Sequence, residues 1–133
     1  MTHRRMLDSH PERPVVDADT LSVCIDACFE CAQACTACAD ACLSEREVAE
    51  LVDCIRADLD CADICEATGR LLSRYSPDGT NLARAFLDTC IAACRACGDE
   101  CDRHASKHQH CRICADACRR CEQACQDMIS VLA

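Results

Sequence analysis

The stretch from Cys24 to Cys42 reads CIDACFECAQACTACADAC and places its cysteines at intervals of 4, 3, 4, 3 and 4 residues. This spacing puts all of these side chains on one face of an α-helix, as positions a and d of a heptad repeat do. A helix normally buries that face against its neighbours with leucine or isoleucine. The buried face of this predicted helix is therefore made of thiols, and they belong to Cys24, Cys28, Cys31, Cys35, Cys38 and Cys42.

The remaining cysteines follow the same spacing in three later segments. The first is sparser, with steps of 7 and 4 residues, and the other two step by 3 and 4 residues throughout. The sequence therefore predicts four helices that all face a common core with thiols. The members of the three segments are Cys54, Cys61 and Cys65, then Cys90, Cys94, Cys97 and Cys101, and finally Cys111, Cys114, Cys118, Cys121 and Cys125, which completes the 18 cysteines of the chain.

The boundaries of these helices are marked by capping and turn residues. Asp17 is a candidate N-cap for a first helix that runs to about Leu43. Ser44 to Glu47 and Ser106 to Gln109 have the pattern of capping boxes, and Leu43 with Val48 has the spacing of a hydrophobic staple. We therefore expect a second helix to begin at Ser44.

The later helices are separated by equally short connections. The second helix is predicted to end at about residue 75, before the turn sequence Ser-Pro-Asp-Gly at residues 76–79. The third spans about residues 80–104, and the fourth runs from about residue 107 to about residue 131. Four long helices with short connections predict an all-α fold, an antiparallel up-down-up-down four-helix bundle with a cysteine-lined core. Either Asp58 or Ala57 takes the core position between Cys54 and Cys61, and the sequence leaves this open.

The composition sets the class of protein. The chain has 133 residues and a net charge of −9, so it lacks the basic surface that nucleic-acid binding needs. No stretch approaches the roughly 20 apolar residues of a membrane span. Arg4 and Arg5 are not followed by the apolar region of an export signal, so we expect a cytoplasmic protein with reduced thiols. Residues 1–16 are predicted to form a flexible or loosely docked arm, and residues 17–133 the bundle.

Packing and disulfide bonds explain the cysteines poorly. Cysteine has modest helix propensity and buries less area than leucine, so packing alone gives no reason to choose it. Neighbours on one helix have Cβ atoms about 5–6 Å apart, whereas a disulfide needs about 3.8 Å. Disulfides between helices would oppose a reducing compartment. A thiol redox protein is kept as an alternative.

Metal binding explains the cysteines better. Zinc sites are discrete four-ligand clusters, usually with Cys-x2-4-Cys pairs on loops, whereas these pairs are parts of continuous rows. The spacings of iron–sulfur proteins are absent, and no glutamate has a histidine three residues later, as a di-iron bundle requires. A soft monovalent ion with two or three sulfur ligands suits closely spaced thiolates, and Cu(I) is such an ion. A zinc or mixed-metal thiolate buffer remains the other alternative.

These cysteine rows resemble those of the four-helix-bundle copper storage proteins. The similarity covers residues of about 17 to 130 and rests on the 18 cysteines named above. It implies reversible storage of many Cu(I) ions inside the bundle, no enzymatic activity and assembly into a homotetramer. A copper chaperone is a candidate donor of the ions. Because the chain shows no export signal, it resembles the cytosolic branch of the family.

The two ends of the predicted bundle differ in chemistry. His104 and His108 fall on the cysteine faces of the third and fourth helices, three residues from Cys101 and Cys111, and imidazole is a possible copper ligand. His110 lies nearby, and its participation is left open. The opposite end collects Leu21, Leu72, Leu87 or Phe86, and Met128. We therefore expect Cu(I) to enter at the histidine end, with His104 and His108 as metal-binding residues, and we expect the apolar end to be closed.

Overall fold

Four long helices run alternately up and down, as the cysteine spacing predicts. The computed structural model describes residues 2–12 and 16–132. The long helices are α2 (Ala18–Leu43), α3 (Val52–Leu72), α4 (Thr80–Asp102) and α5 (Gln109–Val131). A short helix α1 (Thr2–Asp8) precedes them, and two 3-10 turns, η1 (Val48–Leu51) and η2 (Pro77–Gly79), precede α3 and α4. The all-α class and the bundle topology are confirmed.

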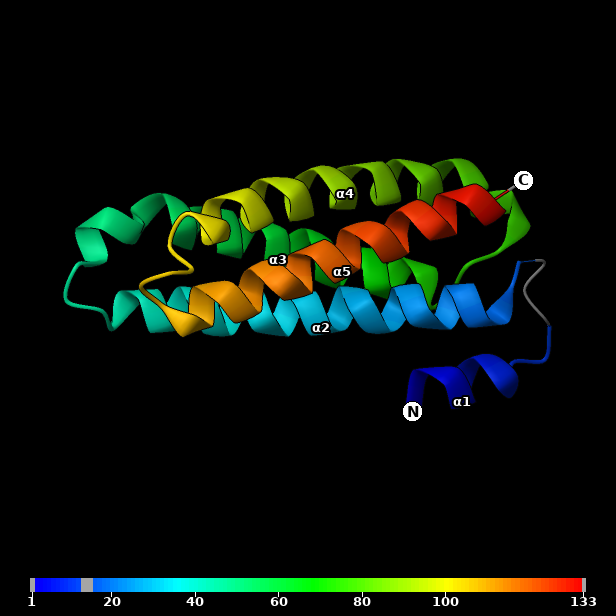
Figure 1. Cartoon of the computed structure of the whole chain (residues 1–133). Helices are drawn as coiled ribbons and strands as arrows, with labels where there is room; N and C mark the ends of the chain where they lie inside the picture. Colours follow the sequence, from blue (N-terminus) through cyan, green and yellow to red (C-terminus); the bar gives the residue numbers. More distant parts are fainter. Residues whose placement is uncertain (1, 13–15, 133) are drawn as a thin grey trace.

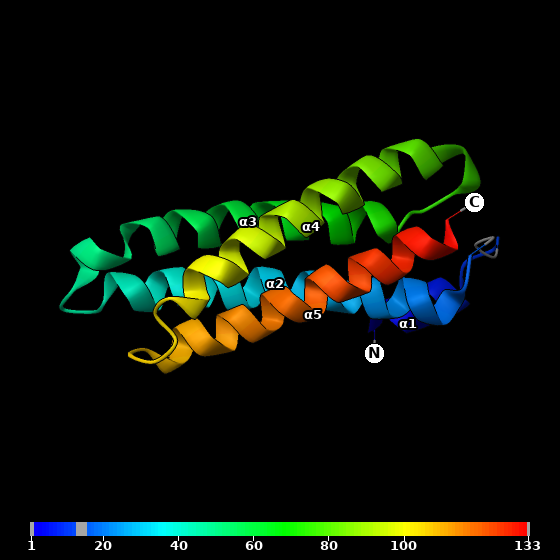
Figure 2. The same cartoon turned by 45° about the horizontal axis from the view of Figure 1, so that its top comes forward.

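The four helices form a square bundle. Helix α2 packs against α3 and α5, and α4 packs against the same two helices. The α2–α3 and α4–α5 connections lie at one end of the bundle, on the left in Figures 1 and 2. The α3–α4 connection, the start of α2 and the end of α5 lie at the other end. We call these the histidine end and the apolar end.

The core contains all of the thiols. Each of the 18 cysteines is buried and unpaired, and none is more than 2% exposed. Asp58 and Thr68 are also fully buried on the cysteine face of α3, whereas Ala57 is only partly buried. Asp58 therefore takes the core position that the sequence left open. At the apolar end the core is closed by large side chains with no exposed surface, namely Leu21, Leu72, Leu87 and Met128.

The start of α2 is capped as predicted, but the two predicted capping boxes do not form. The Asp17 carboxylate accepts hydrogen bonds from the backbone N–H groups of Asp19 and Thr20, at 2.8 and 3.2 Å. Ser44 instead continues α2 as its C-cap, and its hydroxyl donates to the carbonyl of Asp40. Neither η1 nor α3 has a side-chain N-cap, so the prediction that a helix begins at Ser44 was wrong.

The second predicted box fails for a different reason. Ser106 lies in a turn, and α5 begins at Gln109 with His108 as its N-cap. His108 has extended backbone and makes no side-chain capping bond, because its ring is turned toward Glu45 instead. The predicted staple is also absent, since Leu43 is 60% exposed. Contacts between the two connections, and not local capping, therefore shape the histidine end.

The N-terminal arm contains a helix that the sequence analysis did not predict. Within the described residues of the arm, α1 lies beside α2 near the apolar end (Figure 1). Leu7 packs against the bundle core, and Arg4 forms ion pairs with Asp8 and Asp19. One apolar side chain and these charges dock α1 on the bundle, and the flexibility of the arm stays a prediction.

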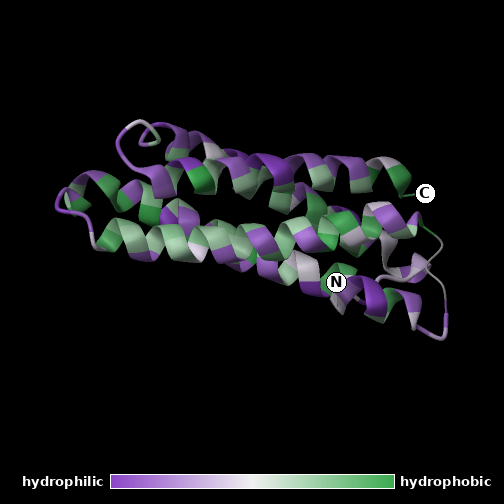
Figure 3. Cartoon of the chain, turned by 60° about the horizontal axis from the view of Figure 1, so that its bottom comes forward, coloured by the Kyte–Doolittle hydropathy of each residue, from purple (hydrophilic) through white to green (hydrophobic). Residues whose placement is uncertain are grey.

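Helix α2 also corrects the statement about membrane spans. By length and composition alone it could cross a membrane, because cysteine and alanine raise its mean hydropathy to 1.3 over its best 18 residues. In the bundle, 44% of that window is buried. Figure 3 shows α2 mostly in pale green, the colour of mildly hydrophobic residues. A core helix of a bundle passes the same test, so this feature is weak evidence for a membrane span.

Candidate metal centre

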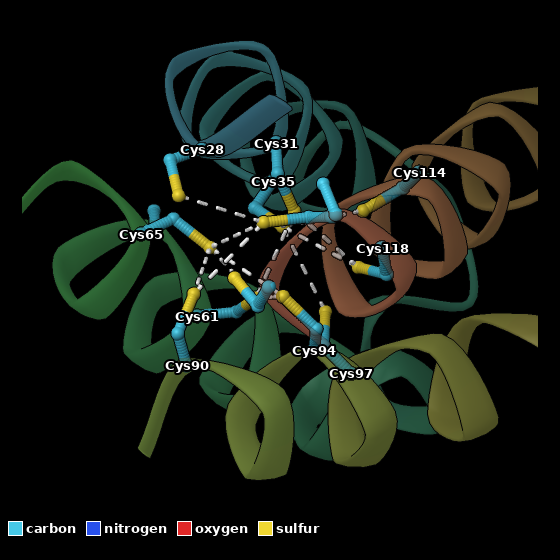
Figure 4. Packing of buried hydrophobic residues seen from close by; sticks show 14 of the residues in the cluster. Cys28, Cys31, Cys35, Cys61, Cys65, Cys90, Cys94, Cys97, Cys114 and Cys118 are labelled. Atoms are coloured by element: carbon cyan, nitrogen blue, oxygen red, sulfur yellow. Dashed lines mark hydrogen bonds between the residues drawn. The ribbon is translucent and has the colours of Figure 1, made fainter. Parts of the chain in front are cut away.

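The sulfur atoms form a network that runs along the bundle axis. Sγ atoms of cysteines on different helices lie 3.5–4.0 Å apart, as for Cys65 and Cys94 at 3.6 Å or Cys31 and Cys118 at 3.8 Å. Figure 4 shows these side chains converging from all four helices. The rows come together because positions three and four residues apart share one helix face. Each thiol therefore has other thiols as its neighbours.

The network divides into four-thiol groups that share members. Within each group the four Sγ atoms lie within 4.8 Å of one another. Cys31, Cys35, Cys118 and Cys121 each belong to two of the groups. A single thiolate could therefore bridge two ions. Five such groups are Cys28, Cys90, Cys121 and Cys125; Cys31, Cys65, Cys94 and Cys121; Cys31, Cys35, Cys61 and Cys118; Cys35, Cys97, Cys114 and Cys118; and Cys38, Cys42, Cys54 and Cys111.

A single carboxyl group interrupts the sulfur network on α3. Oδ1 of Asp58 accepts hydrogen bonds from the thiols of Cys97, Cys114 and Cys101, at 3.1, 3.2 and 3.4 Å. Burial, followed by the negative field of the Cys97 sulfur, raises the pKa of Asp58 to about 9. The carboxyl group is thus protonated at neutral pH in the metal-free protein, which avoids an unpaired charge in the core.

The group nearest the histidine end contains Cys38, Cys42, Cys54 and Cys111. Burial raises the pKa of Cys42 to about 11, and it also raises the pKa of Cys111 above the usual thiol value. The thiols of Cys42 and Cys111 are therefore protonated at neutral pH, whereas the hydrogen bond with Cys101 lowers the pKa of Cys38. A metal ion that binds them must release their protons, so binding depends on pH.

His110 is the histidine that reaches the thiols. Its Nδ1 lies 3.5 Å from Sγ of Cys38 and 3.6 Å from Sγ of Cys111. Burial lowers the pKa of His110, but its hydrogen bonds with Cys38 and Glu45 outweigh this effect and leave the pKa raised. The sequence left the part played by His110 open, because it lies one position away from the cysteine face.

Glu45 joins two of the histidines. Its Oε2 lies 2.8 Å from Nε2 of His110 and 2.9 Å from Nδ1 of His108. The two imidazole rings stack with centroids 5.4 Å apart and an interplanar angle of 23°. The hydrogen bond from His110 is the main reason that the pKa of Glu45 is lowered. Sequence analysis missed Glu45 because a glutamate in a connection carries no pattern of its own.

The third histidine has a different partner. Nε2 of His104 lies 3.4 Å from Oε1 of Glu100, one turn earlier on α4. The structure thus brings His108 and His110 together at the thiols of α2 and α5, while His104 stands beside a carboxylate of its own helix. Of the predicted metal-binding residues, the 18 cysteines converge in the core and the histidines form its polar edge.

Comparisons with known proteins agree with this geometry. The family model described as copper storage protein matches residues 17–130. A copper storage protein from Streptomyces lividans, solved with 10 copper equivalents, is 53% identical and superposes with a TM-score of 0.94 over 98% of this chain and 99% of that chain. Another structure from that organism is described as a cytosolic copper storage protein with five coppers. It is 57% identical, with a TM-score of 0.84 over 86% of this chain and 96% of that one.

A more distant relative shows the same fold. The Cu(I)-bound copper storage protein of Bacillus subtilis is 37% identical, with a TM-score of 0.73 over 86% of this chain and 99% of its own. At these identities and coverages, the likeness extends over nearly the whole of each protein.

Proposed function

We infer that this chain, which belongs to the copper storage protein family, stores multiple Cu(I) ions on the thiolates that line its bundle. The observation that carries this conclusion is the continuous network of 18 buried, unpaired thiols with Sγ atoms 3.5–4.0 Å apart across helices. Soft thiolate ligands select Cu(I), and closely spaced thiolates can bridge successive ions. The related proteins solved with copper have the same bundle.

The sharing of thiols between groups favours Cu(I) over zinc. A structural zinc site uses four ligands of its own, so these thiols would supply at most about four such sites. Each site of four thiolates would carry a charge of about −2 inside a core that holds no buried cation among residues 2–12 and 16–132, which is unfavourable. One Cu(I) per thiolate leaves the core neutral and uses the bridging positions. The arrangement therefore fits a filled column of Cu(I) ions.

The site residues follow from the same geometry. We propose that all 18 cysteines bind copper and that the histidine end is the entrance. The contacts at this end support a larger role for His108 and His110 than for His104, because only the former pair joins the thiol groups through Glu45 and Cys38. His104, which the sequence also predicts as a ligand, stays a candidate that meets ions before they reach the thiols.

The setting of the protein is proposed from its thiols and relatives. A related structure is described as cytosolic, and reduced thiols persist in that compartment. An enzymatic role is not supported by the thiols, because a nucleophilic cysteine must be accessible and these are at most 2% exposed. We therefore propose a cytosolic store without catalytic activity.

The partners are proposed from the surface of α2 and from the family resemblance. Phe29 and Leu43 leave an apolar surface on one face of α2, with exposed fractions of 36% and 60%. This surface supports the homotetramer that the family resemblance implies, and light scattering of the purified protein tests it. A copper chaperone stays the candidate donor, and transfer from a loaded chaperone is the matching experiment.

Anaerobic titration of the reduced protein tests the storage function. Cu(I) should bind in competition with a chelator until about 18 ions are held per chain, one per thiolate. Replacing Cys31 and Cys35 with serine should lower this number by about two, while replacing Ser22 with alanine should leave it unchanged. Saturation at four or fewer ions, or tighter binding of zinc, would contradict the proposal.

A further inference from the structure

The connection between α2 and α3 holds a carboxylate that the storage site does not use as a ligand. Glu45 lies just beyond the C-cap of α2 and reaches across the histidine end to the start of α5. One oxygen of this carboxylate faces nitrogen atoms of both His108 and His110. Its side chain is 31% exposed, so it lies at the boundary between solvent and the core.

The two contacts involve different nitrogen atoms of the two rings. A carboxylate oxygen accepts hydrogen bonds, so the nitrogen that faces it must carry a proton. Glu45 therefore fixes the proton of His110 on Nε2, which leaves Nδ1 toward the sulfurs of Cys38 and Cys111. Nδ1 of His108 lies 2.9 Å from the same oxygen, which favours a proton on Nδ1 and leaves Nε2 as the available ligand atom.

We propose that Glu45 is a positioning residue for copper entry, which orients His108 and His110 so that opposite nitrogens are available for the metal. The partner of a ligating imidazole sets which nitrogen binds a metal, and its loss typically costs 10- to 100-fold in affinity or activity. One oxygen here serves two stacked rings, so a single side chain sets both orientations. This inference rests on the proposed storage function.

The arrangement gives the two histidines separate places in the transfer. Nδ1 of His110 already lies within 3.6 Å of two thiols of the outermost four-thiol group. His108 lies beside it as a ring neighbour and has no hydrogen bond to a cysteine among the described contacts. An ion bound by Nε2 of His108 would therefore pass to Nδ1 of His110 and then to Cys38 or Cys111. The step between the rings exchanges one neutral imidazole for the next, and the last step replaces the thiol proton of the cysteine, which is released to solvent, with the ion.

The test compares Glu45→Ala and Glu45→Gln with the control Glu47→Gln. Glu47 lies in the same connection, is exposed and forms no ion pair among those found, so its substitution changes the net charge without touching the histidines. We expect Cu(I) uptake from a chelator at a substoichiometric dose to be about tenfold slower in Glu45→Ala. Glu45→Gln keeps one acceptor oxygen and should lie between, and Glu47→Gln should match the wild type.

A second measurement separates positioning from charge attraction. Long-range ¹H–¹⁵N spectra of the metal-free protein report which nitrogen of each histidine carries the proton. We expect Nδ1–H on His108 and Nε2–H on His110 in the wild type, and altered or mixed tautomers in Glu45→Ala. Slower uptake with unchanged tautomers, equal slowing in Glu47→Gln, or changed tautomers with normal uptake would each overturn the inference.

The total capacity distinguishes this inference from the storage proposal. Glu45→Ala should still bind about 18 ions at saturation, because every thiolate is retained. Full capacity with a normal uptake rate would contradict the positioning role alone. A wild-type capacity of four ions or fewer would contradict storage itself, whatever Glu45 does.

Discussion

The two ends of the bundle are built from the same helices but differ in the side chains that close them. At the apolar end, Leu21, Leu72, Leu87 and Met128 continue the cysteine rows and are fully buried. At the histidine end the rows finish in thiols that contact an imidazole, and a carboxylate stands behind it. One end therefore contributes stability through buried apolar area, and the other gives up that area for polar groups that a metal ion can use.

The largest expected difference between the ends is in stability. Leu72→Ala removes a fully buried side chain at the apolar end and should lower the free energy of unfolding by about 2–5 kcal/mol. Leu43→Ala makes the same change near the histidine end, where the side chain is 60% exposed, and should cost less than about 0.5 kcal/mol. Urea unfolding of the reduced, metal-free proteins measures both, and equal costs would contradict the comparison.

The next effect concerns the carboxyl group inside the sulfur network. The folded chain holds the proton of Asp58 to a pKa of about 9, whereas the unfolded chain loses it near a pKa of about 3.9. The contribution of this proton to the free energy of unfolding is therefore fully present below about pH 4 and is lost as the pH rises toward about 9. Asp58→Asn has no such proton and should show a flatter pH profile.

The measurement for this variant is unfolding at two pH values. Asp58→Asn and the wild type should be equally stable near pH 4, and the variant should be more stable by several kcal/mol near pH 8. Asp63→Asn, on the exposed side of the same helix, is the control and should not change the profile. A constant difference between Asp58→Asn and the wild type at all pH values would show that the carboxyl group is already ionised in the fold.

Copper transfer should also distinguish the ends. Replacing both His108 and His110 with alanine should slow uptake about tenfold, which corresponds to about 1.4 kcal/mol, and should leave the capacity unchanged. His104→Ala should have a smaller effect, because its ring faces Glu100. Met128→Leu should leave the rate as it is. Stopped-flow transfer from a chelator measures these rates, and a slower rate only in Met128→Leu would place the entrance at the apolar end.

The smallest effect is expected from α1, which lies beside α2 near the apolar end. Arg4→Ala removes the ion pairs with Asp8 and Asp19, which lie on exposed surface, and should lower the free energy of unfolding only slightly. Arg5→Ala changes the charge equally and forms no ion pair among those found. A melting temperature several degrees lower for Arg4→Ala alone would show that α1 stabilises the bundle more than its contacts suggest.

Much of this molecule could be predicted because its pattern is strictly local. Cysteines three and four residues apart define the face of each helix, and short connections then leave one simple topology. The same reasoning failed at Ser44 and Ser106, where capping patterns were present but unused. The histidine end depends on a contact between Glu45 and residues 63 and 65 positions later, which local rules do not include.

The buried carboxyl group shows a second limit. Helical spacing allowed either Asp58 or Ala57 in the core, and hydrophobicity alone would favour alanine. Three thiols of α4 and α5 donate hydrogen bonds to Oδ1 of Asp58, and this compensation becomes visible only when the other helices are in place. Prediction from one sequence recovers the rows of cysteines. It does not recover a buried polar group that is stabilised by hydrogen bonds from those cysteines.

The closed apolar end has a consequence for the order of events inside the bundle. A column of adjoining sites with one opening is filled and emptied in single file, as in a dead-end channel. If loading takes place through the histidine end, the ions that arrive first should move deepest, toward Cys24 and Cys125, and those that arrive last should lie nearest the opening. Copper that enters through this end in two isotopic portions should then leave in reverse order, so the order of release would report the order of loading.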